Sequence, residues 1–167
     1  MRKGLLLGTI FSGLIITALQ PTPMAAAAPT LTGSWQFTLT PTSSPTPVQI
    51  PGLATFTTDG SVVETDGTEF VPSPVVTIPL AVASSPGHGI WETAPVAGTF
   101  YVQYFSLVFE ATGALYAKNV TTMMLAPNST GNQFTGTYST DQIIGNVTKV
   151  LATGTVSGQL IPHQPPP

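Results

Sequence analysis

The chain has no cysteine and few charged residues among its 167 positions. Without cysteine, the protein has no disulfide, no thiolate metal site and no lipid-modified cysteine of the kind that anchors bacterial lipoproteins. Past residue 28 there is no arginine, and two lysines stand against seven aspartates and glutamates, a net charge of −5. Nucleic acids and anionic membrane surfaces attract clusters of lysine and arginine. The sequence therefore predicts neither a nucleic acid nor a membrane surface as a partner.

Motifs for catalysis and for cofactor binding are also missing. The chain has no Gly-x-Ser-x-Gly elbow, no Gly-x-Gly-x-x-Gly turn and no phosphate-binding loop. Only one histidine, His88, lies in the body of the chain, so the usual set of zinc ligands cannot be completed. The sequence predicts no metal and no cofactor, and it favours a binding protein over an enzyme.

The first 28 residues have the features of an export signal. Arg2 and Lys3 form a basic start, Leu5–Leu19 is apolar, and Ala25–Ala28 offers small residues for signal peptidase. The apolar stretch is about 15 residues long, short of the roughly 20 that span a bilayer. We therefore expect a signal peptide over residues 1–28, cleaved near residues 27–28, and a secreted or periplasmic protein with no membrane attachment after cleavage.

The rest of the chain lacks a helical apolar period and instead alternates between apolar and polar residues. Gly33–Thr40 is the clearest case, because Trp35, Phe37 and Leu39 share one face of an extended chain while polar residues occupy the other. This pattern predicts a strand that is buried on one face.

The strongest hairpin signal is the Asp59–Gly60 turn between Leu53–Thr58 and Ser61–Thr65. The proline-rich segment Pro41–Pro51 should break strand pairing before it. Further strands are expected at Val75–Ile78, Gly89–Thr93, Thr99–Glu110, Ala114–Leu125, Gln133–Thr140 and Val147–Ile161.

About eight sequential strands with mostly short connections predict an all-β protein folded as an antiparallel up-and-down β-barrel. The barrel forms a single domain over residues 29–161, followed by a proline-rich tail over 162–167 that should fray. A β-sandwich of six to seven strands is the alternative, and it would show one long connection between its two sheets.

Two patterns link the chain to known families. Gly33, Ser34 and Trp35 resemble the Gly-x-Trp signature of the lipocalin and calycin group, and Ala54–Gly60 with Gly87–Trp91 resembles small exported bacterial lipocalin-like proteins. The resemblance implies that Trp35 closes the base of a lipocalin-like barrel whose lumen holds an apolar ligand. Lipocalins also pack an arginine from the last strand over this tryptophan, whereas Thr155–Ile161 has no basic residue.

Few polar residues are candidates for a site. His88 with Glu92 could serve as a general base, although a histidine that caps a turn between two glycines has the same sequence pattern. Four acidic residues near the hairpin could supply oxygen ligands for calcium, but their spacing favours solvated surface charges. These residues are Asp59, Glu64, Asp66 and Glu69.

The segment Phe100–Phe109 is apolar on both faces, with Phe100, Val102, Tyr104 and Val108 on one of them. Such a strand is covered on both sides, by core packing, by a second copy of the chain in a homo-oligomer, by the proline-rich loop, or by a ligand in the lumen. Met123 and Met124 fall on opposite faces, so only one of them reaches the lumen. The ligand-binding candidates are Tyr101, Gln103, Phe105, Tyr104 and Trp91.

Three functions follow from these patterns. The first is an exported lipocalin-like barrel that binds a small apolar molecule. The second is a barrel enzyme of the allene oxide cyclase type, an architecture similar to this one, in which Tyr101, Tyr104 or Glu110 orients a polyene or polyketide for cyclisation. The third is a structural protein that associates with itself through one face.

Overall fold

The computed structural model describes residues 30–42, 48–69 and 81–162. The predicted signal peptide, the predicted strand Val75–Ile78 and residues 163–167 of the predicted tail lie outside these ranges. The described residues form strands and turns, and none of their segments is a helix long and apolar enough to cross a membrane.

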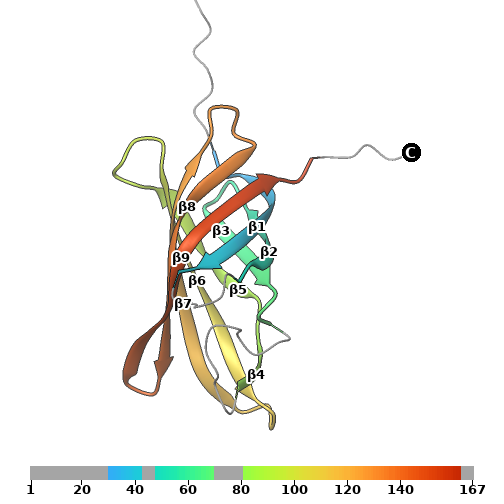
Figure 1. Cartoon of the computed structure of the whole chain (residues 1–167), viewed down its shortest axis with the longest axis vertical. Helices are drawn as coiled ribbons and strands as arrows, with labels where there is room; N and C mark the ends of the chain where they lie inside the picture. The colour runs from blue at the N-terminus through green and yellow to red at the C-terminus, as the bar shows by residue number, and fades with distance from the viewer. Residues whose placement is uncertain (1–29, 43–47, 70–80, 163–167) are drawn as a thin grey trace, which may run out of the picture.

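The chain folds into a closed antiparallel barrel of eight strands with one additional short strand (Figure 1). Neighbouring barrel strands follow the order β1-β2-β3-β5-β6-β7-β8-β9, and β9 pairs with β1 to close the ring. The strands are β1 (Gly33–Pro41), β2 (Ile50–Phe56), β3 (Ser61–Asp66), β4 (Ala81–Ser84), β5 (Gly87–Thr93), β6 (Phe100–Glu110), β7 (Leu115–Pro127), β8 (Gln133–Ile144) and β9 (Val147–Leu160). This confirms the predicted all-β up-and-down barrel and removes the sandwich alternative.

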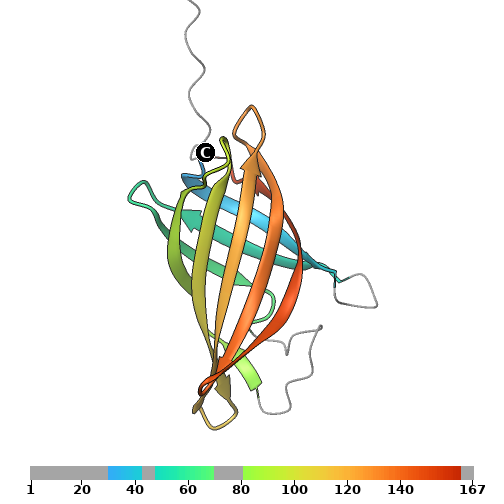
Figure 2. The same cartoon turned by 90° about the vertical axis from the view of Figure 1, so that its left-hand side faces the viewer.

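The long strands β6 to β9 form one wall of the barrel, and β1 to β3 cross behind them at an angle (Figure 2). The additional strand, β4, extends the line of β5. Ser84 pairs with Val108 on β6, and His88 pairs with Phe105 further along the same strand. Because β7 occupies the other edge of β6, β4 and β5 lie one after the other along a single edge.

The prediction that the proline-rich segment breaks pairing is wrong at both ends of that segment. Pro41 pairs with Gly154 on β9, and Pro51 pairs with Thr38 on β1. Proline lacks only the N–H donor, and its carbonyl can still join a ladder. The Pro51 carbonyl accepts a hydrogen bond of 2.9 Å from the backbone N–H of Gly67.

One end of the lumen is filled by apolar side chains around Trp35. The Trp35 side chain is fully buried, its Nε1 donates a hydrogen bond of 2.7 Å to the Leu31 carbonyl, and its ring centroid lies 5.0 Å from that of Phe134. Phe37 and Leu39 are buried on the same face of β1, as the alternation predicts. We call this part of the barrel the Trp35 end.

Aromatic side chains in the lumen stand opposite glycines on neighbouring strands. Phe37 pairs with Gly52 and Phe134 with Gly158, and in each pair a Cβ on the glycine would collide with the ring. Alternating large and small residues in this way lets the interior of a small barrel fill without crowding.

Candidate functional site

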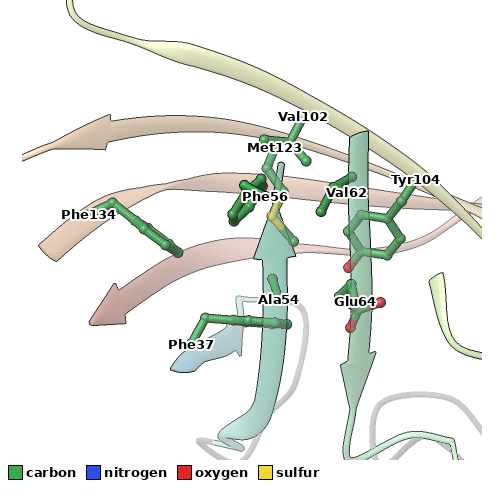
Figure 3. Close-up of a pocket in the computed structure, with 9 residues that line it drawn as sticks. All are labelled: Phe37, Ala54, Phe56, Val62, Glu64, Val102, Tyr104, Met123 and Phe134. Atoms are coloured by element: carbon green, nitrogen blue, oxygen red, sulfur yellow. The ribbon is translucent and has the colours of Figure 1, made fainter. Parts of the chain in front are cut away.

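A small cavity lies inside the barrel beside the Trp35 end (Figure 3). Its volume is about 10 Å³, room for roughly one water molecule. Seven of its lining side chains are apolar, and the two others bear a carboxyl and a hydroxyl group. The lining residues are Phe37, Ala54, Phe56, Val62, Val102, Met123, Phe134, Glu64 and Tyr104.

Glu64 is the acidic residue of this cavity. It follows Val62 on the inward face of β3, and only 5% of its surface is exposed. Its cross-strand partner is Gly87 on β5, where a Cβ would stand 2.6 Å from Glu64 Oε2. The glycine therefore provides the space that the carboxyl group occupies inside the sheet.

Two further carboxyl groups act on Glu64. Burial raises the pKa of Glu64 well above its ordinary value of 4.5, and the charges of Asp66 and Glu69 add to this effect. Thr68 holds the Asp66 side chain in place with two hydrogen bonds to Oδ1, from its backbone N–H at 2.7 Å and from its hydroxyl at 2.6 Å. The environment thus favours the neutral acid form of Glu64.

Two tyrosines belong to the same cluster. Tyr104 projects from β6 with its hydroxyl directed toward Glu64 (Figure 3), and burial, with the charges of Glu64 and Asp66, raises its pKa well above 10.0. Tyr138 on β8 is 5% exposed, and burial together with Asp66 raises its pKa to about 12. Both side chains therefore remain neutral phenols at physiological pH. We call Glu64, Asp66, Glu69, Tyr104 and Tyr138 the carboxyl–tyrosine cluster.

Three atoms of this cluster are buried with no hydrogen-bond partner among the described residues: Glu64 Oε1, Glu69 Oε1 and the Tyr138 hydroxyl oxygen. The threonines nearby are paired, since the hydroxyls of Thr121 and Thr140 lie 2.9 Å apart. Buried polar atoms in native proteins nearly always have partners, so three exceptions in one cluster are unusual.

The spacing of the acidic residues favours solvated charges, and for Glu64 and Glu69 this prediction is wrong. Both are buried, with exposed fractions of 5% and 6%. The register of the β2–β3 hairpin predicts the burial of Glu64. Glu64 lies opposite Ala54, and Ala54 shares the inward face of β2 with Phe56. Among the described residues, no group of three or more histidine and acidic side chains is arranged to hold a metal ion.

The ligand-binding candidates fall on different sides of the wall. Tyr104 lines the cavity, whereas Phe105 is on the outer face with 40% of its surface exposed. Tyr101 and Gln103 share that outer face, where the Gln103 amide donates a hydrogen bond of 3.0 Å to the Tyr101 hydroxyl. Trp91 packs edge-on against Phe56 and Phe100 near the Trp35 end.

His88 and Glu92 do not come together. Both are exposed on the outer face of β5. Four residues along a strand separate them by about 13 Å. The neighbours of His88 across the sheet are Val63 and Phe105. The two methionines divide as predicted, with Met123 in the cavity lining and Met124 exposed outside.

Comparison of the chain with protein-family models, with characterised proteins and with solved structures gives no match. The closed eight-strand antiparallel barrel agrees with a calycin-like architecture. Membership of the lipocalins in particular stays a prediction from the Gly-x-Trp signature.

Proposed function

We propose that the protein binds a small, mainly apolar molecule in the lumen of its barrel. The observation that carries this proposal is the cavity itself, a mostly apolar enclosure that contains a carboxyl group and a phenol. Ligand sites in proteins combine an apolar lining with a few polar groups that orient the ligand in this way.

The ligand enters by displacing side chains, because the cavity of about 10 Å³ is far smaller than the roughly 300 Å³ of a typical ligand pocket. Met123 is the side chain best suited to move, since it lines the cavity and methionine adapts its shape through three rotatable bonds.

Titration with N-phenyl-1-naphthylamine, a neutral apolar dye that fluoresces when it leaves water, tests the proposal. The dye should bind the wild-type protein, and Met123→Ala, which enlarges the cavity, should bind it several-fold more tightly. Ala54→Leu should weaken binding by filling the cavity. Met124→Ala is the matched control, because it removes the same side chain from the outer face and should leave binding unchanged.

The other two functions predict different outcomes. A cyclisation enzyme is favoured by the placement of Tyr104 beside the buried acid Glu64, and it would convert a bound polyene rather than release it unchanged. A structural, self-associating protein is favoured by the packed Trp35 end and by the exposure of Phe105 and Leu107. If neither the wild-type protein nor Met123→Ala binds the dye, the binding proposal is wrong and the structural function is preferred.

A further inference from the structure

The carboxyl–tyrosine cluster contains acceptors that nothing in the described chain satisfies. Glu64 Oε1, Glu69 Oε1 and the Tyr138 hydroxyl oxygen are all buried without a partner, in residues whose surfaces are no more than 6% exposed. A buried acceptor without a donor costs the folded protein stability. A ligand group that brings several donors into the cluster would remove this cost.

The charge of the cluster is of one sign. It contains three carboxyl groups, and both lysines of the described residues lie elsewhere. Lys118 places its Nζ 4.8 Å above the ring of Phe105, a residue of the outer face, and Lys149 is exposed on β9. A cationic ligand group would therefore find partners for its charge here, whereas an anionic group would be repelled.

The space beside Glu64 suits a compact group. Gly87 provides space that the Glu64 carboxyl group and the Tyr104 ring already fill, and the cavity that Glu64 lines has room for a group of about the size of water. The aromatic rings of Phe37 and Tyr104 line the same cavity, and ring faces attract cations that have left water.

We infer that the carboxyl–tyrosine cluster binds the ammonium group of a primary amine, with the apolar part of the ligand among the cavity's apolar side chains. A primary ammonium group brings three N–H donors, and Glu64, which lines the cavity, has an unpaired acceptor in Oε1. When the ammonium group binds, Glu64 gives up its carboxyl proton to solvent and becomes the carboxylate that faces the cation. This inference rests on the proposed function, because it names the polar end of a molecule held in the same lumen.

Isothermal titration calorimetry with three matched probes tests the inference. Butylamine, butanol and pentanoate share one four-carbon apolar chain and differ in the charge and donors of the head group. Butylamine should bind at least tenfold more tightly than butanol, and pentanoate should not bind. Titrations in phosphate and in MOPS, which differ in ionisation enthalpy, should show that protons are released as butylamine binds.

Two variants locate the site. Glu64→Gln keeps the size of the side chain and should lose both the preference for butylamine and the proton release, while Glu92→Gln, on the outer face, should keep both. Tyr138→Phe removes one acceptor and should weaken the binding of butylamine at least threefold. This variant provides a second test if Glu64→Gln does not fold.

Equal binding of butylamine and butanol, or a preference that survives in both Glu64→Gln and Tyr138→Phe, would overturn the inference. The apolar dye separates this failure from failure of the proposed function. If the dye binds in the lumen and butylamine has no advantage, the barrel binds ligands of a different head group. If neither binds, both proposals fail.

Discussion

The ring of Phe37 occupies the space that a side chain on its cross-strand partner Gly52 would need. Three atoms of the ring would collide with a Cβ at that position. Gly52→Ala should therefore destabilise the protein by about 1–3 kcal/mol, because the ring or the strand must shift to make room. Urea denaturation of the purified variant measures this loss.

Gly67→Ala is the control for this prediction. A Cβ on Gly67 would stand 3.6 Å from the nearest atom, Pro51 Cδ, which is ordinary van der Waals contact. We expect a change of no more than about 0.5 kcal/mol. Equal losses for Gly52→Ala and Gly67→Ala would show that the filled space around Gly52 does not matter.

Trp35→Ala should cost about 3–5 kcal/mol, since it empties a fully buried site at the centre of the Trp35 end. Trp35→Phe should cost less, because it keeps most of the contact with Phe134 and loses the hydrogen bond to the Leu31 carbonyl. Chemical denaturation of both variants checks the order. A loss of stability below about 1 kcal/mol for Trp35→Ala would show that this side chain does not fill the Trp35 end of the barrel.

The buried acid Glu64 predicts a specific dependence of stability on pH. Its pKa is raised above 4.5 by burial and by Asp66 and Glu69, so the folded protein retains a proton that the unfolded chain releases. The free energy of unfolding is then highest at acidic pH and falls as pH rises from the unfolded pKa through the folded one. The contribution of this group has a slope of at most about 1.4 kcal/mol per pH unit.

Glu64→Gln should remove that slope. Urea denaturation between about pH 5 and pH 8 should show stability falling with pH in the wild-type protein and changing less in the variant. The variant should also become the more stable protein at the alkaline end. Glu92→Gln should follow the wild-type curve, and a wild-type slope retained in Glu64→Gln would exclude a buried acid at this position.

Strand alternation was enough to predict the barrel and much of its core. On β6 it placed Phe100, Val102, Tyr104 and Val108 on one face, and all four are buried. The alternation does not show which face of β6 lines the lumen, because the other face of this strand is nearly as apolar. Closure of the barrel decides this, and it leaves Phe105 outside.

The carboxyl–tyrosine cluster was harder to predict because its two tyrosines are far along the chain from its three carboxyl groups. Glu64 follows two adjacent valines, Val62 and Val63, so the alternation of its short strand is ambiguous from the sequence. Burial of a carboxyl group is also unusual without a paired cation, which favoured a solvated interpretation. Only the pairing of β3 with β2 and β5 determines that Glu64 faces inward.

Native mass spectrometry of the protein purified from its own host shows directly whether the lumen holds a ligand, because it weighs the chain together with whatever the lumen retains. If the barrel binds a small apolar molecule, we expect an added mass of one small organic molecule that is lost on denaturation, and we expect this molecule to have a primary amine. A folded protein that carries only its own mass, and that also fails to bind the apolar dye, would show that the lumen is not a ligand site.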